Sequence, residues 1–211
     1  MTRVGDEDVS VSKGQAEEKN IKEGKMESKS KELKYGDVRN QIQDGDVLLH
    51  RGKTLVTLLI RLFTWSQYSH AGIAVWWNDR LMAMESIWPM VIINPLSQSV
   101  RRYKGGVDWF RCVKPVDDKR LEMIKFGQKE LGHRFSLPKL ISFLFKFLFR
   151  RRTTEEDRLK RYEKALICSE YVARIYKSVD IDLVKYKADR FTSPADIANS
   201  PLLEKRGILK I

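Results

Sequence analysis

One long apolar run in the middle of the chain constrains the fold more than any other feature. Residues 70–77 read HAGIAVWW and contain a single polar side chain, that of His70. A run of this length and composition is typical of a strand buried on both faces. Asn78-Asp79 then supplies a turn signal, and residues 81–87 and 90–93 have the composition of further strands. The sequence therefore predicts an antiparallel sheet in which residues 70–77 form a central strand.

The remaining elements alternate without a regular βαβ order. Further strands are expected at residues 46–49, 107–113 and 207–211. Apolar spacing and capping residues predict helices at residues 53–64, 117–131, 137–149 and 167–179, and Ser193-Pro194 indicates the start of another short helix. This mixture favours an α+β fold.

The first 40 residues differ in composition from the rest of the chain. They are rich in Lys, Glu, Gly and Ser, contain few large apolar side chains, and carry nine basic and nine acidic residues. Such a segment buries too little apolar surface to offset the entropy lost on ordering. We therefore expect residues 1–40 to be disordered or loosely helical. Residues 41–211 form the expected folded domain, which is long enough to bury a core without disulfides.

The net charge of +12 falls entirely within residues 41–211. A basic domain attracts anionic partners, which include membrane surfaces, cell-wall polymers and nucleic acids. No recognised nucleic-acid motif accompanies the basic residues, which disfavours nucleic acid. Residues 1–35 lack the apolar core of a secretory signal, and no apolar run reaches the roughly 18 residues of a spanning helix. We expect a cytoplasmic protein, with peripheral membrane contact as an alternative.

A histidine, an acid and a cysteine occur in places that suit a nucleophilic site. Cys168 lies at the start of a predicted helix, where backbone N–H groups favour a thiolate and can bind a developing oxyanion. His70 opens the central strand and is the candidate general base. Glu85 falls on the adjacent strand, where a carboxylate could orient the imidazole. Lone cysteines and strand histidines are more often structural, so these roles require Cys168 and His70 to meet in space.

The sequence predicts neither a metal nor an organic cofactor. The chain has three histidines, His50, His70 and His133, and its two cysteines are not clustered with them. This argues against a zinc site. We interpret His133 as a polar residue in a connection between helices, and Cys112 as a packing residue within a strand.

Six short motifs, taken in order, resemble the YiiX/YaeF-like permuted papain-fold amidases of the NlpC-type cysteine peptidase superfamily. The motifs are GDVL at 45–48, RG at 51–52, SHAGI at 69–73, ES at 85–86, CSEYV at 168–172 and SPAD at 193–196. Together they cover most of the expected folded domain. The resemblance implies a permuted papain-like fold, with a small antiparallel sheet or half-barrel flanked by helices. It also implies that Cys168 is the nucleophile, His70 the base and Glu85 the third member of the site.

Two stretches depart from the family pattern. Family members often carry Gly-x-x-Tyr-Asp before the cysteine helix, whereas residues 132–136 here read GHRFS. The resemblance therefore does not define the substrate pocket. Residues 137–164 resemble an insertion, and its Phe-rich part is flanked by basic residues. We expect this Phe-rich helix either to belong to the core or to act as an interfacial membrane anchor.

The expected function is that of a cysteine-dependent hydrolase. It would cleave an amide bond in a peptide, isopeptide or cell-wall peptide, or an ester acyl bond in a lipid. A lipid-directed acyltransferase or phospholipase on the same scaffold is one alternative, and acyl transfer to an amine would distinguish the transferase. A catalytically inactive binding or structural module is the other, since a fold alone does not determine function.

Overall fold

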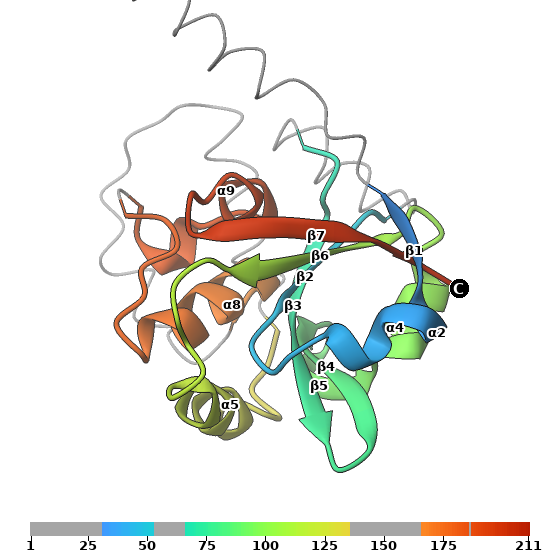
Figure 1. Cartoon of the computed structure of the whole chain (residues 1–211). Helices are drawn as coiled ribbons and strands as arrows, with labels where there is room; N and C mark the ends of the chain where they lie inside the picture. Colours follow the sequence, from blue (N-terminus) through green and yellow to red (C-terminus); the bar gives the residue numbers. More distant parts are fainter. Residues whose placement is uncertain (1–30, 53–65, 136–165, 186) are drawn as a thin grey trace, which may run out of the picture. The chain divides into compact units, whose positions relative to one another are not determined.

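The computed structural model describes residues 31–52, 66–135, 166–185 and 187–211 (Figure 1). Two expected helices, at residues 53–64 and 137–149, lie outside the described residues. The same holds for the insertion expected around residues 137–164 and for residues 1–30 of the charged extension.

A seven-stranded sheet forms the framework, with the order β1-β7-β6-β2-β3-β4-β5. The strands are β1 (Glu32–Lys34), β2 (Val47–His50), β3 (His70–Trp77), β4 (Arg80–Ile87), β5 (Met90–Pro95), β6 (Val107–Cys112) and β7 (Leu203–Lys210). Neighbouring strands are antiparallel except for β1 and β7, which are parallel. Strand β3 has the predicted bounds and lies between β2 and β4, which confirms it as an inner strand.

Helices cover the sheet on both sides (Figure 1). The helices and 3-10 turns are α2 (Tyr35–Val38), η1 (Arg39–Gln41), α4 (Leu96–Arg102), α5 (Arg120–Lys129), α8 (Cys168–Lys177), η3 (Asp189–Phe191) and α9 (Pro194–Ala198). The mixture of helices with a mainly antiparallel sheet confirms the α+β class. Among the described residues, no helix is long and apolar enough to cross a bilayer.

Two hydrophobic clusters divide the core along the two faces of β3. Ile73 belongs to the cluster that includes residues of α5 and α8, whereas Ala74 belongs to the cluster that includes residues of α2 and α4. Successive side chains of a strand point to opposite faces, so both faces of β3 contact core residues. This arrangement explains why almost every side chain of β3 is apolar.

Residues 32–40, at the end of the charged extension, form β1, α2 and most of η1. Strand β1 pairs with the end of β7, where Leu33 lies opposite Leu209. Val38 is buried, and Tyr35 packs against the same apolar cluster. These few apolar residues have a preformed surface to pack on, which composition alone does not reveal. The described part of the chain therefore has secondary structure from Glu32 onward, ahead of the domain start expected near residue 41.

Other elements differ from expectation in detail. Helix α4 was not predicted, and β7 begins at Leu203, ahead of the expected start at residue 207. The helix start at Ser193 is confirmed, because its Oγ accepts a hydrogen bond from the Asp196 N–H while the Asp196 carboxylate accepts one from the Ser193 N–H. This reciprocal capping box satisfies N–H groups that a helix start otherwise leaves unpaired.

Candidate active site

Two consecutive strands, β3 and β4, and the distant helix α8 bring His70, Glu85 and Cys168 together. His70 is the first residue of β3, and Cys168 is the first residue of α8. Glu85 lies on β4, directly opposite Gly72 of β3. Because Gly72 is two positions from His70, the side chains of His70 and Glu85 lie on the same face of the sheet.

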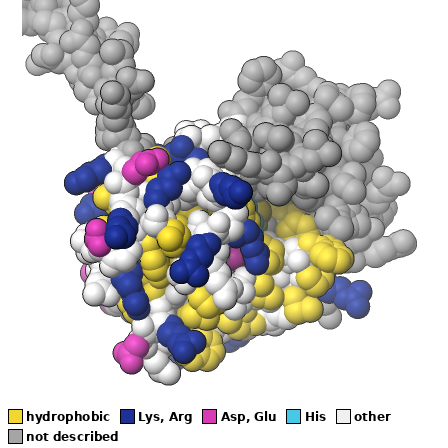
Figure 2. Space-filling view, turned by 90° about the vertical axis from the view of Figure 1, so that its right-hand side faces the viewer, with side chains coloured by type: hydrophobic (Ala, Val, Ile, Leu, Met, Phe, Trp, Pro, Cys, Tyr) yellow, Lys and Arg dark blue, Asp and Glu magenta, His cyan; other side chains and the backbone are white. Residues whose placement is uncertain are grey.

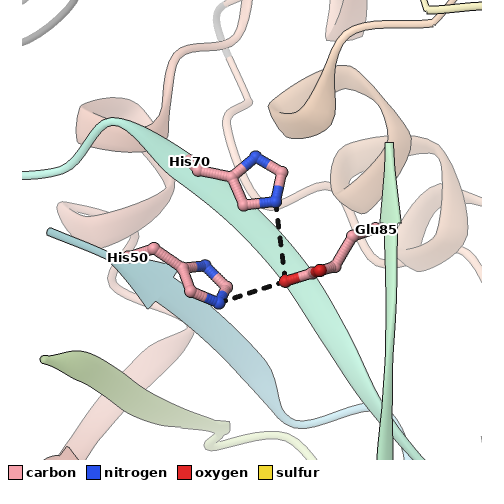
Figure 3. Close-up of side chains that lie close together, drawn as sticks. All are labelled: His50, His70 and Glu85. Atoms are coloured by element: carbon pink, nitrogen blue, oxygen red, sulfur yellow. Dashed lines mark ion pairs between the residues drawn. The ribbon is translucent and has the colours of Figure 1, made fainter. Parts of the chain in front are cut away.

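The Glu85 carboxylate lies across β3 toward the histidine (Figure 3). Its Oε1 is 3.6 Å from Nε2 of His70, and its side chain is 1% exposed. Ser99 of α4 donates from its Oγ toward both carboxylate oxygens, at 3.2 and 3.3 Å. Because Gly72 has no side chain, β3 leaves space for the Glu85 side chain at this point. The sequence signal for this space is the small residue that follows the His-Ala pair.

The thiol of Cys168 and the imidazole of His70 lie close enough for each group to shift the pKa of the other. Cys168 is partly exposed, whereas His70 is buried. The backbone N–H groups of Ala71 and Ser169 also favour the charged form of the sulfur and so lower its pKa. Burial disfavours the thiolate, but His70 and these N–H groups outweigh burial and lower the pKa of Cys168 below its ordinary value.

The pKa values of His70 and Glu85, like that of Cys168, are shifted in the direction that favours the charged form of each group. Burial disfavours the charged imidazole, but Tyr103, Cys168 and Glu85 act in the opposite direction and raise the pKa of His70 well above its ordinary value. Burial also disfavours the Glu85 carboxylate, but the histidines that face it hold its pKa far below the ordinary value. At neutral pH these shifts favour a thiolate, an imidazolium and a carboxylate in contact.

His50 is the residue of this site that sequence reasoning missed. It ends β2 directly opposite His70, and it is fully buried. Its Nε2 is 3.1 Å from Oε1 of Glu85, closer than the Nε2 of His70 (Figure 3). Burial lowers the pKa of His50 below its ordinary value, although Glu85 opposes this shift. The predicted strand ended one residue too early, at residue 49, and so did not align the two histidines.

Aromatic packing completes the surroundings of the two imidazoles. The centroids of the His50 and His70 rings are 4.9 Å apart. Tyr103 lies 4.5 Å from the His50 ring and stacks on the His70 ring at 6.0 Å. These ring contacts restrict the orientations that both imidazoles can adopt.

His50, His70 and Glu85 also form a group of potential metal ligands. One donor atom from each residue lies within 4.8 Å of the others. Two imidazoles and a carboxylate are a common donor set for zinc and for other transition metals. The Nε2 atoms of His50 and His70 are buried and have no well-aligned hydrogen-bond partner. The donors therefore fit a metal ion, which the residue pattern of the sequence did not predict.

A buried carboxylate holds the ends of β2 and β3 beside the site. Asp108 is fully buried, and its Oδ2 accepts from Arg51 at 2.7 Å and from the Tyr68 hydroxyl at 2.6 Å. The ammonium of Lys205 lies 2.5 Å from the same oxygen. Arg51 directly follows His50, so this network supports the position of the second histidine.

The other residues singled out from the sequence lie elsewhere. Cys112 is buried at the end of β6, and burial raises the pKa of its thiol. His133 is about half exposed, and its Nδ1 is 2.7 Å from Glu130 near the end of α5. Neither belongs to the group around Glu85.

Comparison with known proteins identifies the fold. No family model and no curated protein sequence matches the chain. Among solved structures, the metalloprotein YiiX (DUF1105) of Escherichia coli O157:H7 is similar, with a TM-score of 0.61 and 19% sequence identity. The similarity covers 81% of this chain and 99% of the YiiX chain. At this level of identity the similarity establishes a YiiX-like fold, in agreement with the sequence motifs, and the activity has to be argued from the site.

Proposed function

We propose that this protein is a cysteine-dependent hydrolase that cleaves an amide or ester acyl bond. Cys168 is the nucleophile, His70 the general base and acid, and Glu85 the residue that orients His70. The observation that carries the proposal is that the Cys168 thiol and the His70 imidazole lie close enough to shift each other's pKa, with Glu85 3.6 Å from the same imidazole. The order histidine, acid, cysteine along a YiiX-like fold is consistent with a permuted papain-like site.

The geometry supports a two-step acyl transfer. The Cys168 thiolate attacks the carbonyl carbon, and N–H groups at the start of α8 are available to the resulting oxyanion. His70 then gives its proton to the leaving amine or alcohol, and a thioester remains on Cys168. In the second step His70 takes a proton from water, the hydroxide attacks the thioester, and the carboxylic acid leaves as the thiol is restored. Glu85 stabilises the imidazolium that is present before the first step and that forms again in the second.

Acyl-electrophile probes of peptide and lipid type test this proposal. Cys112→Ser provides the background, because it removes the second thiol of the chain. We expect probes to label this background and to leave Cys168→Ala unlabelled, with strongly reduced labelling of His70→Ala. Equal labelling of Cys112→Ser and its His70→Ala derivative would contradict the proposed base. The preferred probe type distinguishes a peptide amidase from a lipid-directed enzyme, and transfer to an added amine identifies an acyltransferase.

The surface supports an anionic partner for this enzyme. Figure 2 shows a face on which Lys and Arg side chains lie among hydrophobic ones. Among the described residues, Arg101 and Arg102 are exposed basic side chains at the end of α4. We propose contact with an anionic membrane or a cell-wall polymer. Cosedimentation with anionic but not with neutral vesicles, weakened by salt, is the expected result for a membrane.

A second candidate function is the binding of a divalent transition metal. It is favoured by the group formed by His50, His70 and Glu85, and the structural neighbour YiiX is a metalloprotein. These three residues would hold the ion. When bound, such an ion supplies Lewis-acid chemistry.

A further inference from the structure

We infer that metal binding by His50, His70 and Glu85 and thiol hydrolysis by Cys168 exclude one another, because both need the imidazole of His70. The metal site would therefore act as an off-switch for the enzyme. The exclusion rests on the proposed hydrolase function, whereas the metal site itself does not depend on it.

The donor atoms are spaced as a small cation requires. Nε2 of His50 and Nε2 of His70 lie 3.1 and 3.6 Å from Oε1 of Glu85 (Figure 3). Zinc–nitrogen and zinc–oxygen bonds of about 2.0–2.2 Å place neighbouring ligands of a tetrahedral centre about 3.3 Å apart. Both contacts to the carboxylate are close to that spacing. The widest pair of donors, within 4.8 Å, would have to close slightly around the ion.

His50 has no part in the proposed hydrolysis, yet it is buried at the centre of this group. Its side chain is fully buried, and its Nε2 faces the carboxylate without a well-aligned hydrogen bond. Burying an imidazole in this way costs free energy unless a partner satisfies its nitrogen. A cation would satisfy the nitrogens of His50 and His70 at the same time. Ser99, which donates to Glu85, would be an outer residue that orients the ligating carboxylate.

The exclusion arises because the ion and the hydrolysis would both need the nitrogens of the same ring, that of His70. During hydrolysis, His70 must alternately hold and release a proton, with the Glu85 carboxylate stabilising the charged form. A cation on Nε2 of His70 uses a lone pair of the ring and also takes the Glu85 carboxylate. The neutral ring then has only its N–H nitrogen left, which offers no lone pair to take the proton of the attacking water. The acylated Cys168 cannot turn over while the ion is bound.

Cys168 lies outside the ligand group, so a bound ion should have no sulfur ligand. The cysteine contacts His70, but its sulfur is not among the donor atoms that converge around Glu85. Cobalt(II) should therefore bind with visible d–d bands and without a sulfur-to-cobalt charge-transfer band. A strong charge-transfer band in the unmodified protein would overturn the assigned ligand set, and this readout needs no variant.

Zinc affinity of the metal-free full chain, measured by competition with a chromophoric chelator, tests the site. We expect His50→Gln to weaken zinc binding by more than about 100-fold, because even residues outside the ligand set change affinity by 10–100-fold. His133→Gln is the matched control, since it removes a half-exposed histidine that also faces a glutamate. His50→Cys places a different ligand atom at this position and should retain zinc binding. Retained binding would show that the loss in His50→Gln does not come from misfolding. Equal affinity of His50→Gln and the native chain would overturn the site.

Hydrolysis of a fluorogenic acyl ester, with Cys168→Ala as background, tests the exclusion. Zinc should stop steady-state turnover at the concentrations that fill the site, and His50→Gln should need about 100-fold more zinc, in proportion to its affinity. Full occupancy without inhibition would overturn the exclusion. If the metal-free chain shows no Cys168-dependent hydrolysis while zinc binding still depends on His50, the proposed hydrolase fails and the exclusion fails with it. The metal site would then stand alone.

Discussion

Gly72 lies directly opposite Glu85 in the pairing of β3 with β4, and the missing side chain of the glycine makes room for the glutamate. A Cβ atom on Gly72 would lie 2.9 Å from Cγ of Glu85 and 3.5 Å from its Oε1. The first distance is shorter than carbon atoms tolerate without movement. The carboxylate can therefore lie across β3 toward His70 and His50 because this position is glycine.

Gly72→Ala should displace Glu85 from both histidines. We expect a loss of about 1–3 kcal/mol in the free energy of unfolding, as for other overpacked interiors. Cys168-dependent hydrolysis should fall by at least about tenfold, which corresponds to a loss of about 1.4 kcal/mol in transition-state stabilisation. Urea unfolding and ester hydrolysis measure the two effects. Gly36→Ala is the control, because its Cβ would have no neighbour within 4 Å. Equal behaviour of the two variants would contradict the role of Gly72.

The pH dependence of Cys168 alkylation should reveal the contact with His70. Because the pKa of Cys168 is lowered, the thiolate should form at lower pH than the value of about 8.5 that is usual for a free thiol. The raised pKa of His70 keeps the imidazolium present over the same range, up to the pKa of the histidine. Iodoacetamide rates in the metal-free Cys112→Ser variant give the midpoint.

His70→Ala should move that midpoint upward, because burial of the thiolate is then no longer offset by a neighbouring positive charge. A native midpoint at the ordinary thiol value that does not respond to His70→Ala would favour the inactive module instead.

Glu85 should make stability depend on pH in a defined direction. Its pKa in the folded state lies far below the value of about 4.3 expected for the unfolded chain. The stabilisation from the ionised carboxylate is therefore fully present above that unfolded value, and it is lost as the pH falls toward the folded pKa.

Urea unfolding of the native chain and of Glu85→Gln between neutral and acidic pH measures this contribution. We expect a difference of at least about 1.4 kcal/mol at neutral pH, which corresponds to one pKa unit, and a smaller difference in acid. Glu204→Gln is the control, because Glu204 is 60% exposed in a surface ion pair. A Glu85→Gln difference that stays constant with pH would refute the assigned ionisation.

Asp108→Ala should destabilise the ends of β2 and β3. The substitution removes the common acceptor of Arg51, Tyr68 and Lys205. Breaking a buried ion pair costs about 3–5 kcal/mol, and the two cations here are about one-fifth exposed, so we expect roughly 2–4 kcal/mol. Asp182→Ala, which breaks an exposed pair with Lys177, should change the free energy of unfolding by less than about 1 kcal/mol. Similar urea midpoints for Asp108→Ala and Asp182→Ala would contradict the proposal that Asp108 stabilises the ends of β2 and β3.

Local signals in the sequence were sufficient for several elements. The apolar run of β3, the turn at Asn78 and the capping box at Ser193 each depend on neighbours within a few residues. In contrast, β1 exists because it pairs with the distant strand β7. Helix α4 also lacks a capping side chain at its start, which leaves little for a sequence pattern to detect. Pairing and packing partners far along the chain account for such omissions.

For the candidate site, residue types and their order were enough to select Cys168, His70 and Glu85, whose catalytic roles stay a prediction. Only the tertiary structure placed His50 beside them. The physical reason is strand register. His50 pairs with His70, and Gly72 pairs with Glu85, so the side chains of His50, His70 and Glu85 lie on one face of the sheet. A shift of one residue in either pairing would turn a side chain to the opposite face. That register arises from packing across the whole sheet, and a single stretch of sequence does not contain it.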